Sequence, residues 1–338
     1  MEKNQEQEIT KQEKKWYEKQ IGIVEVKDFV VLAFAILVAL SSLLSTLVVK
    51  ESGEILYLFT PNFFSNVKGA GFVTAFYFIP LIAGILFIFA RFNKIYRTIA
   101  FILIVISEAF IFSFAAIVNE LNESSHNLGA GPIVAGVLLS LSLLVIIREN
   151  FIENQFSVRE IVEIGVLVAL ALVFDQVGPV IRIRAGAGSI NLAMLPLFII
   201  AFRFNFIKSW IAIGVVFGLI SNQMDGYGIQ TYPFDYFLGY GLSVALAAFF
   251  QKLAFPKRGA SAKFHHYAFF ALAISVGVIG RLLSSTISGV VLYETDFIGS
   301  LVYNGSNILP TGLITLVLLL FLYPAILVIN RRFPASNE

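Results

Sequence analysis

Ten stretches of predominantly apolar residues follow one another along this chain, separated by shorter polar segments. A helix needs about 20 mostly apolar residues to cross a lipid bilayer, and most of the stretches approach or exceed that length. The pattern therefore predicts an all-α integral membrane protein with about ten transmembrane helices. The expected helices lie near residues 28–49, 70–90, 97–118, 131–147, 159–176, 190–203, 208–222, 233–252, 266–291 and 300–330.

The composition agrees with a multi-pass protein of the cell membrane. Only 14% of the 338 residues are charged and the mean hydropathy is +0.84, whereas a soluble domain carries roughly 25% charged residues. The 34 phenylalanines suit a surface that faces lipid. A net charge of +2 gives no indication of nucleic acid as a partner. The absence of cysteine excludes disulfides, thiolate metal sites and cysteine nucleophiles.

The distribution of Lys and Arg over the short loops predicts the orientation, because cytoplasmic loops are enriched in these residues. The loops near 91–97, 148–159, 203–208 and 252–263 and the final segment at 331–332 are basic. The alternate loops are poorer, with no Lys or Arg in 119–130, 223–231 or 292–299. Arg182 and Arg184 are exceptions to this pattern. We therefore expect both termini in the cytoplasm.

A charged, polar stretch from Arg148 to Arg159 divides the chain. Four expected helices precede it and six follow it, and the two sets do not repeat each other as the halves of many secondary transporters do. Residues 1–27 are rich in Lys, Glu and Gln and lack the features of a signal peptide. The expected domains are a cytoplasmic tail over 1–27, a four-helix module of unknown role over 28–150, and a six-helix domain over 158–332.

Several chemistries lack their sequence signatures. No G-x-x-x-x-G-K-[ST] phosphate loop and no H-E-x-x-H zinc motif occurs, so we expect neither an ATPase nor a metalloenzyme. The three histidines, His126, His265 and His266, fall in expected loops or at helix ends, where interfacial residues are common. We therefore predict no catalytic residues, no metal site and no cofactor.

The second half carries a series of motifs in a fixed order. They are VREIVEIGVLVALALVFD (158–175), GAGSINLAMLP (186–196), IGVVFGL (213–219), YPFDY (232–236), RLLSSTISG (281–289) and LVYNGSNILP (301–310). This ordered set resembles the thiamine-specific S-component, the substrate-binding subunit of energy-coupling factor transporters. The resemblance covers about residues 158–332 and leaves residues 1–150 uncovered.

The resemblance implies a six-helix membrane subunit that captures a thiamine-like molecule near the outer face, under the loop from Arg182 to Ser189. Its partners would be an energy-coupling transmembrane protein and two ATPase subunits. Small residues on the first helix of the module would contact the coupling protein, here Gly165 and Ala169, which lie four residues apart on one helix face. Ordinary helix packing within the bundle is the alternative role of these two residues.

Substrate-binding residues follow from the resemblance one at a time. Asp235 and Tyr236 occupy the acidic and aromatic pair, where a carboxylate can neutralise a cationic ring and an aromatic face can stack on it. Tyr227 falls near another aromatic of the family, although the loop is about two residues shorter. Asn304 stands where the family directs an Asn to the pyrimidine. The alternatives are an interfacial Asp with a belt Tyr and an Asn that forms a hydrogen bond within the bundle.

Three positions depart from the family. Ser285 stands in place of a ligand-contacting His, Tyr293 in place of a Trp, and Gly299 where a Tyr is expected. A lost polar partner changes which ring a pocket accepts, so a related vitamin or a pyrimidine precursor is an alternative substrate. Arg182 and Arg184 would lie beside the mouth, either to recognise a phosphate or carboxylate or as solvated loop charges.

One ionisable residue interrupts the apolar stretches of the first half. Glu108 lies within ILIVISEAFI (102–111), where a charge is costly and usually faces protein or a water-filled cavity. Together with Asp235 it raises a further alternative, a self-sufficient secondary transporter that uses both carboxyl groups as proton sites.

Overall fold

The computed structural model describes residues 20–21, 24–25, 29–60, 63–122, 125–153, 156–176, 181–182, 189–293 and 295–335. Contacts divide the chain into two compact units. Unit 1 comprises Met1–Phe112 and His126–Arg148, and unit 2 comprises Ser113–Ser125 and Glu149–Glu338. Each unit is described by itself.

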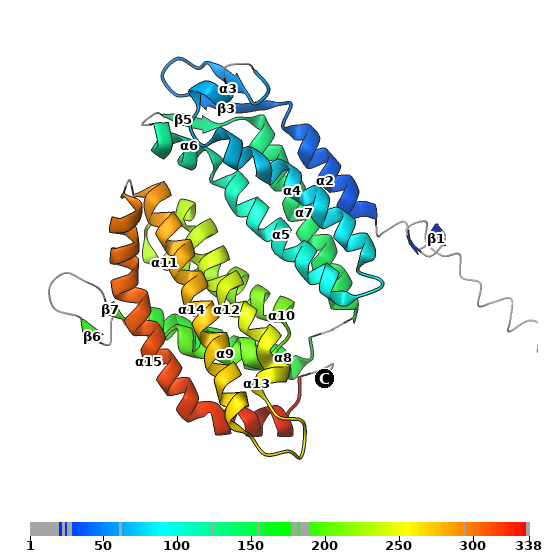
Figure 1. The fold of residues 1–338 in the computed structure, drawn as a ribbon, viewed down its shortest axis with the longest axis vertical. Coiled ribbons are helices and arrows are strands. Elements are labelled where there is room, and N and C mark those ends of the chain that lie inside the picture. The colour runs from blue at the N-terminus through cyan, green and yellow to red at the C-terminus, as the bar shows by residue number, and fades with distance from the viewer. Residues whose placement is uncertain are drawn as a thin grey trace, which may run out of the picture. The chain divides into compact units, whose positions relative to one another are not determined.

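Unit 1 contains a bundle of apolar helices with a small antiparallel sheet, in the strand order β4-β3-β5 (Figure 1). Gly84 allows α2 to pack closely against α4, since a Cβ atom at this position would lie 2.6 Å from the Cα atom of Leu32. The elements are β1 (Gln20–Ile21), β2 (Val24–Glu25), α2 (Val30–Ser41), β3 (Ser45–Val49), β4 (Ile55–Tyr57), α3 (Phe63–Asn66), α4 (Ala70–Phe89), α5 (Lys94–Phe112), β5 (His126–Leu128) and α7 (Ala130–Glu153), the last of which ends within unit 2.

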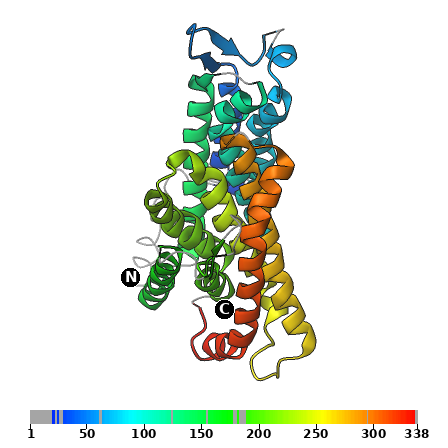
Figure 2. The ribbon, with the colours of Figure 1, turned by 90° about the vertical axis from the view of Figure 1, so that its left-hand side faces the viewer.

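Unit 2 is mainly helical, and its two longest helices, α14 and α15, lie side by side (Figure 2). Two runs of consecutive helical segments, Phe206–Asp225 and Ile229–Ala254, are each long and apolar enough to cross a membrane. Each run changes helix type along its length. The elements are α6 (Phe114–Asn122), α8 (Val158–Gln176), β6 (Ile181–Arg182), β7 (Ser189–Ile190), α9 (Met194–Arg203), α10 (Phe206–Trp210), η3 (Ile211–Phe217), α11 (Gly218–Asp225), η4 (Ile229–Thr231), η5 (Tyr232–Leu242), α12 (Ser243–Ala245), η6 (Leu246–Phe250), α13 (Gln251–Ala254), α14 (Phe264–Leu292) and α15 (Phe297–Arg332).

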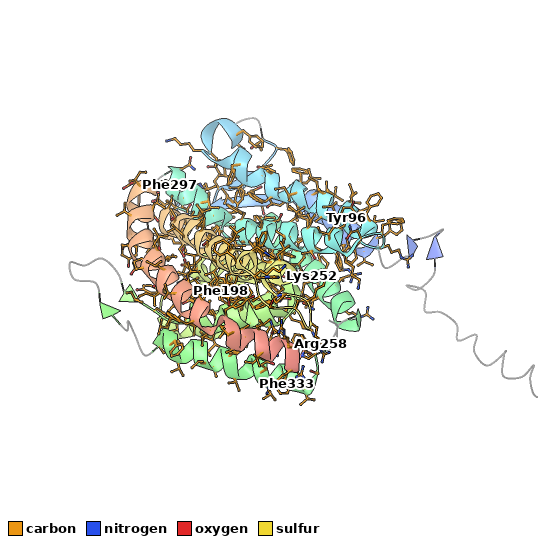
Figure 3. All side chains as sticks on the ribbon, turned by 60° about the horizontal axis from the view of Figure 1, so that its bottom comes forward. Tyr96, Phe198, Lys252, Arg258, Phe297 and Phe333 are labelled. Atoms are coloured by element: carbon orange, nitrogen blue, oxygen red, sulfur yellow. The ribbon has the colours of Figure 1, made fainter. Side chains whose placement is uncertain are left out.

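Two π-helical segments, η3 and η5, pack closely against each other in unit 2. A Cβ atom at Gly241 would lie 2.6 Å from the Cα atom of Gly214, so neither position has room for a larger residue without a shift of backbone. Segments of this kind are frequent at functional sites. The core beside them is aromatic, and Phe198 lies among its helices (Figure 3), in contact range of the position where Gly277 lacks a side chain.

Among the described residues, seven helices are long and apolar enough to cross a membrane: Gly71–Phe89, Lys94–Phe112, Ala130–Arg148, Phe206–Asp225, Ile229–Ala254, Phe264–Leu292 and Phe297–Arg332. This number is lower than the ten expected. The remaining three expected segments also coincide with helices, but α2 and α9 are shorter, and α8 carries four charged residues. The all-α membrane architecture is thus confirmed with about seven candidate spans.

Two expected helices end earlier than the apolar pattern indicated. The segment 28–49 is helical only to Ser41, whose hydroxyl group donates to the carbonyl of Val38 at 2.7 Å. The following residues form β3, which pairs with β4 and β5 and so satisfies its backbone groups outside a helix. The segment 97–118 is divided at Ser113 into α5 and α6. The first correction arises because apolar composition alone does not distinguish a helix from a buried strand.

Candidate functional site

Unit 2 contains a cavity of about 730 Å³ between the ends of α8 and α11, the first turns of η5, and the facing sides of α14 and α15. Small-molecule sites typically have volumes of about 300–1,000 Å³. All six residues expected to bind substrate line this cavity, namely Tyr227, Asp235, Tyr236, Ser285, Tyr293 and Asn304. The structure therefore brings together residues that lie up to 77 positions apart in the sequence.

Asp235 is held at the cavity wall by a serine-rich face of α14. Its carboxylate accepts a hydrogen bond from the Ser288 hydroxyl at 2.8 Å and a second one from Ser285. The neighbouring Ser284 hydroxyl donates to the backbone carbonyl of Phe234 at 2.5 Å and so fixes η5 against α14. These serines are three and four residues apart and therefore lie on one helix face. Ser285 thus orients the acidic residue at the position where a His was expected to contact ligand.

A second acidic region forms the opposite part of the lining and was missed by sequence reasoning. Asp175, at the end of α8, accepts hydrogen bonds from Asn191 at 2.7 Å and from Ser221. Asp225, at the end of α11, accepts one from the Tyr236 hydroxyl at 2.7 Å. The signal was available, because both residues end apolar stretches on the side of the bundle where Asp235 was also expected.

Arg281 is the third residue that sequence reasoning missed. Its guanidinium carbon lies 3.7 Å from the centroid of the Tyr240 ring, and both side chains line the cavity. An arginine within an otherwise apolar helix was the signal, since such residues usually face protein or a water-filled cavity.

Aromatic residues form the more exposed part of the lining. Tyr227 and Tyr293 are 62% and 47% exposed, and their rings meet edge to face with centroids 6.2 Å apart. Tyr303 also lines the cavity, whereas Gly299 does not. Gly299 instead lies in the first turn of α15, where its N–H donates to the capping carboxylate of Asp296 at 2.8 Å. Tyr303 lies one helical turn after Gly299, the position at which the resemblance led us to expect a tyrosine.

Asn304 holds α14 to α15. Its amide nitrogen donates to the Ser285 carbonyl at 3.1 Å and to the Ser300 carbonyl at 3.0 Å. The hydrogen bond within the bundle that was expected as an alternative is therefore present, and the residue also lines the cavity.

Gly165 and Ala169 lie away from the cavity on the exposed face of α8. A Cβ atom at Gly165 would meet nothing within 4 Å, so this glycine is not required for packing inside the bundle. The opposite face of the helix buries Ile164, Val168 and Ala171.

The loop expected to cover the site lies largely outside the described residues. Residues 183–188, and with them Arg184, are not among the described residues, and neither is the side chain of Arg182. The flanking backbone pairs Arg182 with Ser189 and Ile181 with Ile190 in the short strands β6 and β7.

The lining combines three carboxylates and one guanidinium with several tyrosines, which suits recognition of a polar, cationic ring compound. Within the part of the chain that the structure describes, no group of three or more His, Asp or Glu residues could hold a metal ion.

The second half of the chain is similar in sequence to known proteins. Residues 161–330 match the model of a family described as thiamine transporter protein. The thiamine transporter ThiT of Bacillus subtilis is 26% identical over 177 residues, which cover 48% of this chain and 89% of that protein. A solved structure of ThiT from Listeria monocytogenes covers 49% of this chain and 95% of its own, with 21% identity and a TM-score of 0.43.

This is a family of multi-pass membrane transporters rather than enzymes. Because the family model spans just over half of the 338 residues, the chain belongs to the thiamine transporter family.

Proposed function

We propose that residues 158–332 form the substrate-binding subunit of an energy-coupling factor importer. The subunit captures thiamine or a related compound at the outer face for ATP-driven uptake. Its six helices are α8, α9, the runs Phe206–Asp225 and Ile229–Ala254, α14 and α15. The observation that carries the proposal is the cavity of about 730 Å³ lined by all six residues expected from the family resemblance.

The charges around the cavity favour a cationic ligand. Three aspartates and one arginine line it, so an organic cation improves the local charge balance. Asp235 presents a carboxylate already oriented by Ser288, which lowers the entropic cost of binding a positively charged ring. Tyr236 lies beside it and also lines the cavity, and its ring stacks on that of Tyr240 with centroids 5.8 Å apart.

The partners in this proposal are an energy-coupling transmembrane protein and two ATPase subunits, with the exposed Gly165 and Ala169 face of α8 as the docking surface. Both termini lie in the cytoplasm, as the Lys and Arg distribution favours. This orientation places the cavity toward the outside.

A different vitamin or a pyrimidine precursor is the alternative substrate. Ser285 forms a hydrogen bond with Asp235 at the position where the family has a ligand-contacting His, so the polar partners offered to the ligand differ. A second candidate function is proton-coupled secondary transport. Its supporting observation is Glu108, which is buried in unit 1 and accepts a hydrogen bond from the Ser140 hydroxyl at 2.5 Å. Uptake by the isolated chain driven by a proton gradient alone would favour that candidate, and co-purification of coupling subunits would favour the first.

The central experiment measures thiamine binding to the purified chain and its Asp235→Asn variant by calorimetry. The substitution removes the charge and keeps the shape, so we expect at least a tenfold loss of affinity, or about 1.4 kcal/mol. An Asp296→Asn variant, changed at an exposed helix cap outside the cavity, serves as the control. Equal affinities of wild type and Asp235→Asn would remove Asp235 from the site.

A further inference from the structure

Arg281 is a cationic side chain in a cavity whose other charged groups are acidic. Its Nε atom is buried and has no hydrogen-bond partner among the described residues. Nor does Arg281 form an ion pair with any carboxylate in the described part of the chain. An arginine within a membrane-spanning helix is costly unless a partner or a water-filled space compensates its charge. Capture of a cation does not explain why this residue is present.

The position of the guanidinium group is fixed from one side. It rests on the ring of Tyr240, which is 4% exposed and is itself held edge to face by Phe217 at 5.1 Å. Stacking covers a face of the guanidinium plane without engaging its N–H donors, and the side chain also lines the cavity. The edge of the plane carries the N–H donors, whose spacing matches two oxygens of a phosphate or carboxylate.

Asp235 is close enough for its carboxyl group to experience the charge of Arg281, but it does not serve as the ion-pair partner. Its carboxylate instead accepts hydrogen bonds from Ser288 and Ser285. The cavity therefore presents an acidic group and a basic group that remain separate, as recognition of a ligand with two opposite charges requires.

We propose that Arg281 determines specificity by binding the phosphate group of a phosphorylated ring compound, whose cationic ring faces Asp235. The inference rests on the proposed function and extends it from thiamine-like rings to their phosphate esters. A volume of about 730 Å³ leaves room for such an extension, since it lies in the upper part of the usual range for small-molecule sites. Tyr240 acts as a positioning residue for the guanidinium group.

The test compares binding of thiamine and of thiamine monophosphate to the purified full chain by calorimetry. Arg281→Gln is expected to weaken binding of the phosphate ester at least about tenfold more than binding of thiamine, because a charge-assisted bidentate contact is lost. Arg281→Lys keeps the charge without the planar edge. Its affinity for the phosphate ester should therefore lie between those of the wild type and Arg281→Gln. Arg258→Gln, at an exposed arginine in the loop before α14 (Figure 3), is the matched control and should change neither affinity.

A second variant addresses the position of the guanidinium group without removing it. Tyr240→Leu takes away the aromatic surface under Arg281, and it should also reduce affinity for the ester more than affinity for thiamine. This arm keeps the test informative if Arg281→Gln does not fold.

Equal losses for both ligands in the Arg281 and Tyr240 variants, or no loss in either, would overturn the role of Arg281 while leaving thiamine capture intact. Binding of the ester but not of thiamine, with the expected Arg281 dependence, would support this inference and contradict thiamine as the substrate. Binding of neither compound by the wild-type chain would overturn both proposals.

Discussion

Replacing Lys208 with methionine removes one partner of a buried ion pair that joins the first turn of α8 to α10. The Lys208 ammonium lies 3.1 Å and 3.2 Å from the two carboxylate oxygens of Glu160. The side chains are 4% and 0% exposed, respectively. Glu160 also accepts hydrogen bonds from the backbone N–H and the hydroxyl group of Ser157. The variant therefore leaves a buried carboxylate with neutral donors but without this cation.

The expected loss of stability follows from desolvation rather than from the attraction alone. Removing one member of a buried pair typically costs about 3–5 kcal/mol, because the remaining charge stays away from water. Replacing both residues with apolar ones of similar volume is often neutral. We therefore expect Lys208→Met to lower the free energy of unfolding by about 3–5 kcal/mol, and the double variant Lys208→Met with Glu160→Leu to recover most of that loss.

Reversible unfolding in detergent, followed by circular dichroism, measures these free energies for both single variants and the double variant. Lys252→Met is the control, because Lys252 is an exposed lysine on α13 of the same unit (Figure 3). A loss below about 1 kcal/mol for Lys208→Met, the range of surface ion pairs, would refute the reasoning. A double variant that is as unstable as the sum of the singles would refute it as well, since the two residues would then act independently.

Replacing Gly165 and Ala169 with leucine adds bulk to an exposed helix face, so thiamine binding measured by calorimetry should survive. Transport in reconstituted vesicles and co-purification of the coupling protein should fail, and persistent transport would exclude this face as the docking surface. Ser285→His restores the ring found in the family beside Asp235 and should strengthen thiamine binding. Adding Gly299→Tyr should bring no further gain, because position 299 does not line the cavity and its Cβ atom would lie 2.8 Å from the Asp296 carboxylate. Thiamine binding by the wild-type chain that equals that of relatives with the His would show that the departures are compensated.

The sequence was sufficient for the long helices, because an apolar run of this length has few alternatives to a membrane-spanning helix. Helices α14 and α15 fall within a few residues of the expected 266–291 and 300–330. The end of α2 was not predictable in this way. Its apolar run continues into β3, and the difference depends on pairing with β5, a strand about 80 residues later in the chain.

The cavity was predictable only where a family motif pointed to it. Asp235 and Tyr236 stood in such a motif, and both line the cavity. Asp175, Asp225 and Arg281 could be recognised as unusual residues near apolar stretches, but their convergence depends on how α8, α11 and α14 pack together. A one-dimensional pattern carries no information on that packing, and so the acidic and basic groups facing the same space were missed.

Helix α8 was expected to span the membrane but is not among the candidate spans. Its 19 residues include four charged ones, too many for the helix to count as a candidate span. These charges lie at its two ends, with Arg159, Glu160 and Glu163 in the first turns and Asp175 in the last. Glu160 is paired with Lys208, Glu163 with Arg203, and Asp175 is bonded to Asn191 at the cavity. The residues between them, 164–174, are all apolar or glycine. The charged ends therefore fix the helix within unit 2 while its apolar middle can face lipid or a membrane partner, a division that the number of charged residues alone does not reveal.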